Sequence, residues 1–296
     1  MVITLSCLTF NKPNLVIVDA STKLNDVLSL MQQNNITSVV VEKNGDFLGF
    51  VTTIEIMTEI AFGSFEWDHP KPEEFELFKS SDKTVETLLN MNHKTQQIHY
   101  YQDSDMLQNV FEPMGRGIRR VLVKSKFNQY RLISQTDVVA YVATHLDLLK
   151  IHIDTNQTVG ELQLASDPPT KPIWKLATSE SAINGFRFLT LKNILSAPIV
   201  NERDEIISTL SASDLRGLKS DNLKSVLTPV LDYLKTVNGG HFHPVTCTLN
   251  DSLQMVILKL TTARIKRIWV VNSAQQPIGA ISLRSIISLF NSCYKI

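Results

Sequence analysis

The chain has few cysteines and no excess of either charge. Its 296 residues include Cys7, Cys247 and Cys293, which lie far apart and in no paired spacing. This pattern argues against a disulfide framework or a structural zinc site and favours a reducing compartment. The 29 basic residues balance 29 acidic residues, and no Lys/Arg tract stands out, which argues against binding to nucleic acid through its phosphate backbone.

Long apolar runs and targeting signals are also missing. No run reaches membrane-spanning length, and the N-terminal MVITLSCLTF lacks the basic leader and cleavage site of a signal peptide. We therefore expect no membrane association and a cytoplasmic location, with the nucleus left open. Because 43% of the residues are hydrophobic, the chain is expected to form a well-packed core.

What the sequence does contain is a fourfold repeat. The clearest copy spans 193–218, NILSAPIVNERDEIISTLSASDLRGL. Two apolar runs flank a charged turn at 201–205, which predicts strand, hairpin and strand, followed by a helix that begins at Ser211. The same order recurs three more times along the chain, so the repeats predict a mixed α/β (α+β) fold.

The repeats divide the chain into four predicted domains. Their boundaries are placed at 1–62, 84–149, 155–219 and 221–292. The acidic, proline-containing stretch 63–83 is expected to be a surface linker, with a docking segment for a partner as the alternative. Recognisable lead-in segments precede three of the repeats, at Thr84, Thr158 and Asn222.

The end of the second strand in each repeat resembles a known family. The cystathionine-beta-synthase-type (CBS) domain has Gly, two apolar residues, Ser/Thr, two variable residues and Asp at this place. Four such copies without a catalytic domain resemble the gamma regulatory subunits of AMP-activated and sucrose-nonfermenting-type protein kinases. This resemblance implies two pairs of domains (Bateman modules), one with two and three with four, in a disk-like, pseudo-symmetric arrangement. The matching segments are GFVTTIE at 49–55, RLISQTD at 131–137, STLSASD at 208–214 and GAISLRS at 279–285.

The resemblance assigns the acidic residue of this motif to the two ribose hydroxyls of an adenine nucleotide. A carboxylate suits this role because its two oxygens accept two O–H donors, each bond contributing about 1.5–3 kcal/mol. Asp137 and Asp214 keep the carboxylate, Glu55 places it on a longer arm, and Ser285 lacks it. The alternative reading is a helix capping box, which has the same sequence signature and is compatible with binding. The hydroxyl residues expected at these sites are Thr52, Ser134, Ser211 and Ser282.

Phosphate ligands are expected from cations at the start of the first core strand. The gamma family carries a His-Arg pair there. Arg119 and Arg120 stand at the matching place of the second repeat, and Lys266 and Arg267 at that of the fourth. Arginine recognises phosphate in a planar, bidentate manner, while a solvated edge residue is the alternative reading.

The domain pairs that the resemblance implies combine these residues into nucleotide sites. The best-supported site joins Asp214 of the third repeat with Arg267 of the fourth, together with their neighbours Ser211 and Lys266. A weaker site joins the Thr52 motif with the arginines of the second repeat. Asp137 finds no cation at the matching strand start of the first repeat. Ser196 and Ala197, which match a Ser-Ala pair that contacts nucleotide in the gamma family, complete the predicted set.

No catalytic or metal-binding constellation stands out. His241 and His243 could lie on one face of a strand, but no further Cys or His is at ligand spacing, so no metal is expected. Cys247 is accompanied by neither an oriented triad nor an oxyanion turn. Gly239-Gly240 lacks the Lys-Ser/Thr of a phosphate loop. We therefore do not expect an enzyme.

Together these observations predict a non-catalytic regulatory protein. The resemblance implies that AMP, ADP or ATP binds as a regulatory ligand between paired domains, with no other cofactor. It also implies energy sensing on behalf of a protein kinase, whose catalytic and scaffold subunits would be the partners. The alternative is a CBS-domain scaffold with reduced or no nucleotide binding, for example a phosphatase regulator. Glu55 and Ser285 favour the scaffold, whereas Asp214 with Arg267 favours the sensor.

Overall fold

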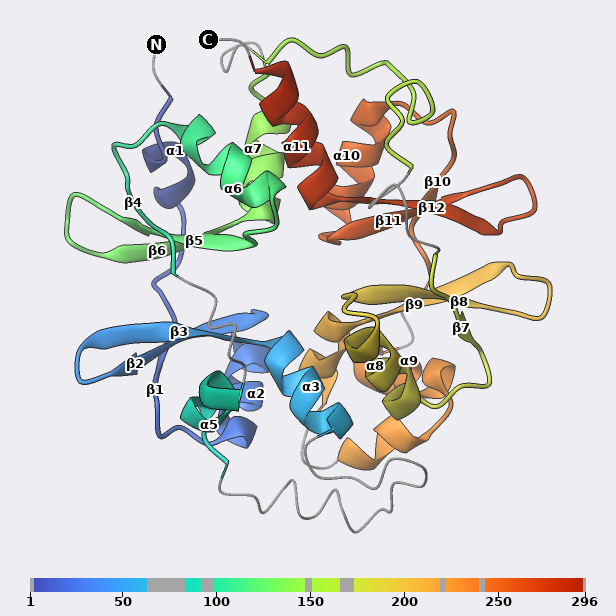
Figure 1. Ribbon diagram of the computed structural model, residues 1–296, viewed down its shortest axis with the longest axis horizontal. Coiled ribbons are helices and arrows are strands. Elements are labelled where there is room, and N and C mark those ends of the chain that lie inside the picture. Colours follow the sequence, from blue (N-terminus) through green and yellow to red (C-terminus); the bar gives the residue numbers. More distant parts are fainter. Residues whose placement is uncertain are drawn as a thin grey trace. The chain divides into compact units, whose positions relative to one another are not determined.

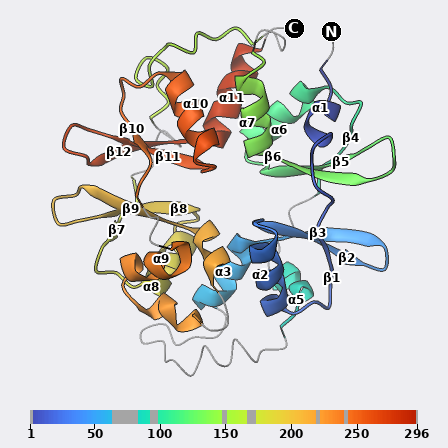
Figure 2. The same cartoon turned by 180° about the vertical axis from the view of Figure 1, so that it is seen from behind.

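The computed structural model of the chain places each of the four sequence repeats on a small sheet of its own (Figure 1). The same sheets are seen from behind in Figure 2. Of the predicted linker 63–83 only Lys83 is described, and His241 lies outside the described residues. The structure describes residues 3–62, 83–91, 98–146, 151–165, 173–218, 222–239 and 243–294.

The first repeat shows the common plan. Strand β1 (Ile17–Asp19) runs parallel to β2 (Ser38–Lys43), and β2 pairs antiparallel with β3 (Asp46–Thr52). Helix α2 (Leu24–Gln33) connects β1 to β2, and α3 (Thr53–Phe62) follows the hairpin. This order confirms the α/β fold predicted from the sequence.

The other three repeats follow the same plan, with one parallel and one antiparallel pair of strands each. The second contains β4 (Tyr100–Gln102), η1 (Leu107–Val110), α6 (Phe111–Gly115), β5 (Arg120–Lys124), β6 (Tyr130–Ser134) and α7 (Gln135–Ala143). The third contains β7 (Leu176–Ala177), α8 (Ala182–Leu191), β8 (Ser196–Val200), β9 (Ile206–Ser211) and η2 (Ala212–Gly217). The fourth contains β10 (Thr246–Cys247), α10 (Leu253–Thr262), β11 (Arg267–Val271), β12 (Pro277–Ser282) and α11 (Leu283–Cys293).

The third repeat differs from its prediction after the second strand. The helix expected to begin at Ser211 is the 3-10 helix η2, and it ends at Gly217. A Cβ atom on Gly217 would lie 2.4 Å from Cβ and 2.5 Å from the carbonyl oxygen of Val237. Only glycine allows η2 to approach the neighbouring helix so closely, and the chain turns away there into extended backbone at Leu218.

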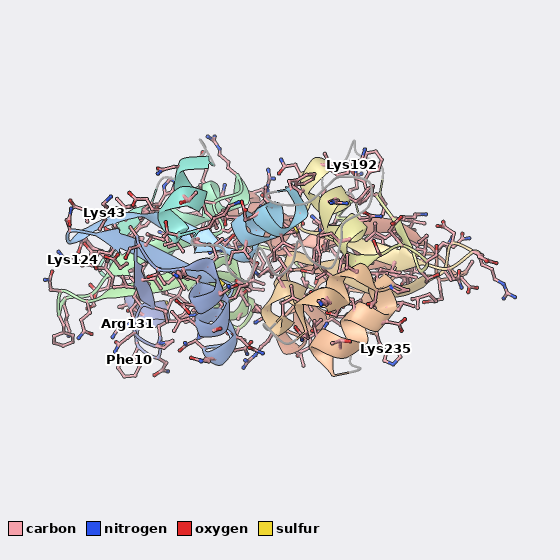
Figure 3. All side chains as sticks on the ribbon, turned by 90° about the horizontal axis from the view of Figure 1, so that it is seen from below. Phe10, Lys43, Lys124, Arg131, Lys192 and Lys235 are labelled. Atoms are coloured by element: carbon pink, nitrogen blue, oxygen red, sulfur yellow. The ribbon has the colours of Figure 1, made fainter. Side chains whose placement is uncertain are left out.

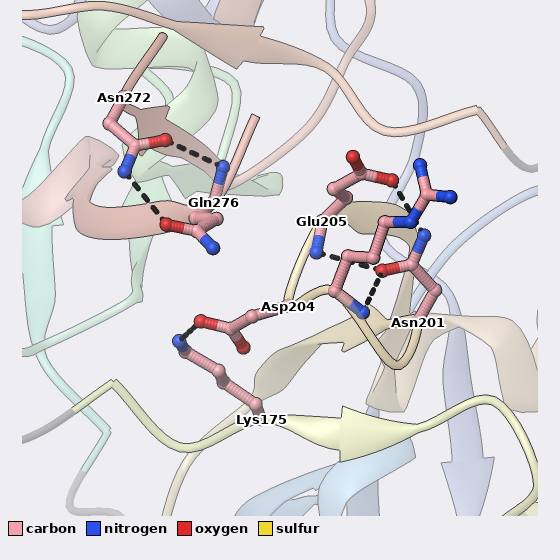
Figure 4. Close-up of polar contacts among 7 residues, drawn as sticks. Lys175, Asn201, Asp204, Glu205, Asn272 and Gln276 are labelled. Atoms are coloured by element: carbon pink, nitrogen blue, oxygen red, sulfur yellow. Dashed lines mark hydrogen bonds and ion pairs between the residues drawn. The ribbon is translucent and has the colours of Figure 1, made fainter. Parts of the chain in front are cut away.

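An asparagine at the first position of the turn closes each of two hairpins (Figure 4). In the third repeat Asn201 Oδ1 accepts hydrogen bonds from the backbone N–H groups of Arg203 (2.9 Å) and Glu205 (3.0 Å). In the fourth, Asn272 Oδ1 accepts in the same way from Ala274 (3.0 Å) and Gln276 (2.9 Å). The two turns therefore have the same hydrogen-bond pattern, in which the side-chain oxygen of an asparagine accepts from two backbone N–H groups.

Replacing Asn201 with alanine is expected to destabilise the protein by about 1–2 kcal/mol, because two backbone donors of a tight turn lose their acceptor. Chemical denaturation followed by circular dichroism measures the change. Asn272→Ala is the matched variant and should lose a similar amount. A free energy of unfolding that neither variant changes would contradict this account of the turns.

The repeats are grouped into two compact units. The odd-repeat unit contains residues 16–97 and 174–244, and thus repeats one and three. The even-repeat unit contains residues 1–15, 98–173 and 245–296, and thus repeats two and four. Each unit has its own hydrophobic core. In the odd-repeat unit α3 packs against α8 and η2, and in the even-repeat unit α11 packs against α6 and α7.

Three of the lead-in segments pack on a repeat other than the one that they precede. Helix α5 (Val85–Met91), which precedes the second repeat, packs on β3 of the first. Helix α1 (Ser6–Thr9), which precedes the first repeat, packs on β6 and α7 of the second. Helix α9 (Val230–Asn238) precedes the fourth repeat and packs on η2 of the third. The predicted domain boundaries did not foresee this exchange. The short helix η3 (Leu223–Leu227) lies ahead of α9.

None of the helices in the described part of the chain is both long enough and apolar enough to span a membrane.

Candidate functional site

The candidate site residues occupy equivalent positions in the four sheets. The hydroxyl residue of each motif ends the last strand, and the antiparallel register places it opposite the first residue of the middle strand. Position by position, the sheets therefore confirm that the repeats correspond in structure. The opposed pairs are Ser38 with Thr52, Arg120 with Ser134, Ser196 with Ser211, and Arg267 with Ser282.

Each of the four motifs closes a turn of backbone at the start of the following helix. The backbone N–H of the hydroxyl residue donates to the side chain three positions later, at 2.8 Å for Glu55, 2.8 Å for Asp137, 2.7 Å for Asp214 and 2.9 Å for Ser285. The helix-capping interpretation of the motif is thus correct in all four repeats. Because a carboxylate has about four acceptor positions, the cap alone does not use up an aspartate or glutamate.

Asp214 contacts side chains of helix α9 as well as its own motif. Its Oδ1 accepts a hydrogen bond from Asn238 Nδ2 at 3.1 Å, and its backbone carbonyl accepts one from the Tyr233 hydroxyl at 3.2 Å. Burial raises the pKa of Asp214 to about 6, against the opposing effects of the Asn238 and Ser211 hydrogen bonds and of the Arg216 charge. The carboxyl is therefore mostly ionised at pH 7, in surroundings that disfavour the charge.

Arg216 connects this motif to the first repeat. Its guanidinium Nη1 donates to Asn35 Oδ1 at 2.6 Å and to the backbone carbonyl of Asn35 at 3.4 Å. Burial lowers the pKa of Arg216, and the charge of Asp214 partly offsets that effect. The sequence analysis missed Arg216, and the only signal for it is its place two residues after Asp214.

Asp137 has a different set of partners. Its Oδ2 accepts from both the backbone N–H and the hydroxyl of Ser134, each at 2.8 Å. Its Oδ1 lies 2.6 Å from the Lys12 ammonium. The sequence analysis found no cation for Asp137, because Lys12 lies in the segment before the first repeat. No pattern in the sequence links this lysine to the second repeat.

Glu55 also turns back onto its own motif. Its Oε2 accepts from the backbone N–H of Thr52 at 2.8 Å and forms a second, short hydrogen bond with the Thr52 hydroxyl. Thr52 itself is buried, with 1% of its surface exposed. Ser285 completes the cap of the fourth repeat with a hydroxyl and no charge.

The predicted cations lie in the even-repeat unit. Arg120 is buried, with 8% of its surface exposed, whereas Arg267 is half-buried and Lys266 exposed. The Arg267 guanidinium lies 5.6 Å from the centre of the Trp269 ring, a cation–π distance. Arg119 precedes β5 and accepts a backbone hydrogen bond from Gln135 at 3.1 Å. All four cations are thus at strand starts, as predicted.

The two units divide the predicted site residues between them. Asp214 belongs to the odd-repeat unit and Arg267 to the even-repeat unit, so their joint action stays a prediction. Within the odd-repeat unit, Ser196 is buried beside Ala197 and pairs in register with Ser211. The odd-repeat unit holds Thr52, Glu55, Ser196, Ala197, Ser211 and Asp214. The even-repeat unit holds Arg119, Arg120, Ser134, Asp137, Lys266, Arg267 and Ser282.

The thiol of Cys247 is placed unfavourably for nucleophilic chemistry. Cys247 is buried, and burial raises the pKa of its thiol to about 12, so that it is protonated at neutral pH. Among the residues that the structure describes, no three His, Cys, Asp or Glu side chains are grouped so that they could hold a metal ion.

Comparison with known proteins identifies the repeats. Residues 9–61 and 241–292 match the family model of the CBS domain. These segments include most of the first and fourth repeats, whose strand order the other two repeats share. The first and fourth repeats therefore match the CBS domain, and the second and third repeats share its strand order.

Similar proteins include gamma subunits of protein kinases. The chain is 24% identical to the 5′-AMP-activated protein kinase subunit gamma of Saccharomyces cerevisiae over 291 residues, covering 92% of this chain and 85% of that protein. It is also 24% identical to the subunit of the same name from Kluyveromyces lactis over 292 residues, covering 92% and 84% of the two chains. In sequence the protein thus resembles these gamma subunits along most of its length.

Solved structures show the same fold. A protein of Methanocaldococcus jannaschii, proposed to be an archaeal homologue of the AMP-activated kinase gamma subunit, superimposes with a TM-score of 0.73 at 14% identity. The match covers 97% of this chain and 100% of that chain. An uncharacterised Pyrococcus horikoshii protein matches with a TM-score of 0.56 at 12% identity, with the same coverage.

Proposed function

We propose that this protein is a non-catalytic regulatory subunit that binds an adenine nucleotide through Asp214. Binding of the nucleotide would change the activity of a protein kinase that is bound to this subunit. The resemblance to kinase gamma subunits over most of both chains supports the class of partner. The partners would be the catalytic and scaffold subunits of the kinase, and the signal would be the cellular balance of AMP, ADP and ATP.

The observation that carries the proposal is the charge at residue 214. Ser285 forms the same capping box with a neutral hydroxyl, so a cap at this position does not require a carboxylate. Burial nevertheless disfavours the ionised form of Asp214 and raises its pKa to about 6. A charge that the fold does not need, and that its surroundings oppose, is typical of a binding residue.

The hydrogen bonds of Asp214 also leave it able to bind a diol. Among the residues that the structure describes, its Oδ2 accepts from Ser211 N–H and its Oδ1 from Asn238, so each oxygen has one donor. The Ser211 hydroxyl is engaged with Ser213 instead, at 2.7 Å. Because each carboxylate oxygen has two lone pairs, each oxygen of Asp214 keeps one acceptor position for a ribose hydroxyl.

Regulation then follows from linkage. A nucleotide changes the activity of a bound kinase only if it binds two conformations of the protein with different affinity. The contacts of Asp214 with α9, through Asn238 and Tyr233, connect the ligand-binding carboxylate to a helix outside its own motif. This helix is a candidate for the element that moves.

A scaffold without nucleotide binding is the second candidate function. It is favoured by Glu55, whose Oε2 is already engaged by its own motif, and by Ser285, which has no carboxylate. Such a scaffold would present the repeats as an interaction surface, for example to restrain a phosphatase.

Calorimetric titration with AMP, ADP and ATP distinguishes the two functions. We expect binding by the natural protein. Asp214→Ala should weaken it at least about 30-fold, because two charge-assisted hydrogen bonds are lost. Arg267→Ala should weaken it as well, because the family resemblance assigns phosphate to this guanidinium.

The matched control for this titration is Asp232→Ala, which removes an exposed aspartate from α9 that pairs with Lys235 at 3.0 Å. Its affinity should equal that of the natural protein. If correctly folded natural protein gives no heat with any adenine nucleotide, the scaffold is the better account.

A further inference from the structure

Both aspartates of the repeated motif receive a donor from a lead-in segment of another repeat. Asn238 ends α9, which precedes the fourth repeat and packs on the third, where it meets Asp214. Lys12 precedes the first repeat and meets Asp137 in the second. Each of these segments begins at an isolated β-bridge, formed by Thr4 with Met106 and by Pro229 with Ser181. The two donors lie at comparable distances along the chain from these bridges, since Lys12 is eight residues after Thr4 and Asn238 is nine residues after Pro229.

The two aspartates differ in how much acceptor capacity remains. At Asp137 both lone pairs of Oδ2 are used by Ser134, and Oδ1 faces the Lys12 ammonium at 2.6 Å. Oδ2 therefore has no lone pair left for a ribose hydroxyl, so a ribose can be bound only at Oδ1. The remaining route is through Oδ1, where Lys12 forms a charge-assisted contact that is stronger than a neutral hydrogen bond.

Asp214 meets a weaker competitor. The Asn238 amide is neutral and lies 3.1 Å from Oδ1, and the hydroxyl of Ser211 bonds to Ser213 and not to the carboxylate. Asp137 is therefore paired with a charged side chain, whereas the side chain of another segment that hydrogen-bonds to Asp214 is a neutral amide.

Backbone hydrogen bonds hold the segment that carries Lys12. The backbone N–H of Leu5 donates to the Asp105 carbonyl at 2.8 Å, and the N–H of Lys12 donates to the Thr9 carbonyl at 3.1 Å. Between these anchors Phe10 is 88% exposed and extends away from the fold (Figure 3). The turn is thus held by backbone hydrogen bonds, while its outer side at Phe10 is open to solvent.

We propose that the ion pair with Lys12 prevents the carboxylate of Asp137 from binding the ribose of a nucleotide. The second repeat would then bind a nucleotide only when this ion pair is broken. This inference rests on the proposed function. It adds that a side chain of the protein itself, Lys12, competes with the nucleotide for Asp137. The lead-in of the first repeat would thereby set how many nucleotides the protein holds. Any partner that draws the N-terminal turn away from Asp137 would increase that number.

The test isolates the second repeat by using Asp214→Asn as the background. Calorimetry with AMP should detect little binding by this variant. Asp214→Asn with Lys12→Met should bind AMP about two- to fivefold more tightly, since a partly buried ion pair no longer competes. Asp214→Asn with Lys12→Arg keeps the charge and should match the background. Adding Asp137→Asn to the Lys12→Met variant should abolish the gain.

The outcomes separate this inference from the proposed function. If the natural protein binds AMP and removing Lys12 gives no gain in the Asp214→Asn background, Lys12 is not a competitor, although the proposed function stands. If the natural protein does not bind AMP, the proposed function fails and this inference fails with it. Thermal melting of each variant, followed by circular dichroism, verifies that the protein is folded in both comparisons.

Discussion

Asp214→Asn is expected to stabilise the folded protein at neutral pH while abolishing nucleotide binding. The folded state holds this carboxyl at a pKa of about 6, raised from the usual value of 3.8 by burial. At pH 7 the ionised group therefore costs about 3 kcal/mol of stability. A neutral amide of the same shape avoids this cost but cannot bind a diol with two charge-assisted bonds.

The sign of the pH dependence follows from the raised pKa. Between pH 3.8 and about 6 the folded state binds more protons than the unfolded state, so the contribution of Asp214 to stability falls as pH rises through this window. The natural protein and Asp214→Asn should therefore be similar in stability near pH 4 and differ by about 1–3 kcal/mol above pH 7. Denaturant titrations at pH 4, 5.5 and 7.5 measure the difference.

Asp137→Asn is the matched variant for this comparison. It removes a carboxylate from the same position of a capping box, but there the charge is paired with Lys12 at 2.6 Å. We expect it to lose about 0.5–1 kcal/mol at pH 7.5, the opposite direction to Asp214→Asn. A loss of several kcal/mol in Asp214→Asn at neutral pH would show that its carboxylate is a structural cap and would remove the main argument for binding.

Gly217→Ala is expected to destabilise the odd-repeat unit by about 1–3 kcal/mol. The added Cβ would lie 2.5 Å from the carbonyl oxygen of Val237, a backbone atom that cannot turn aside, so η2 and α9 must separate. This movement also draws Asp214 away from Asn238. Urea denaturation measures the loss of stability, and an AMP titration should show weaker binding.

The control for this substitution is Gly49→Ala in β3 of the same unit. A Cβ at Gly49 would meet the nearest side-chain atom, Leu89 Cδ2, at an ordinary contact distance of 3.4 Å. Its stability should change by less than about 0.5 kcal/mol. Equal effects of the two substitutions would contradict the close approach of η2 and α9 as the reason for glycine at 217.

Local features of this fold could be predicted from the sequence. Alternating apolar runs around polar turns indicated the hairpins, and Ser/Thr-x-x-Asp indicated the helix starts at Ser134 and Ser211. These features depend on neighbouring residues, so a short window of sequence contains their causes. The capping interpretation, which could not be separated from binding in the sequence, is realised in all four repeats.

The partners of the motif could not be predicted, because they come from distant segments. Lys12 lies 125 residues before Asp137, and Asn238 belongs to a lead-in that the sequence assigned to the next repeat. The sequence also could not predict that repeats one and three form one compact unit and repeats two and four the other. Helices α3, α8 and α11 each have an apolar face, and such a face does not specify which helix it packs against.

The central claim is that the carboxylate of Asp214 binds both ribose hydroxyls of an adenine nucleotide. Calorimetric titration of the natural protein with AMP and with 2′-deoxy-AMP tests it directly, because the two ligands differ in one of those hydroxyls. We expect AMP to bind at least about tenfold more tightly, as the loss of one charge-assisted hydrogen bond requires. Equal affinities for the two nucleotides would contradict the account.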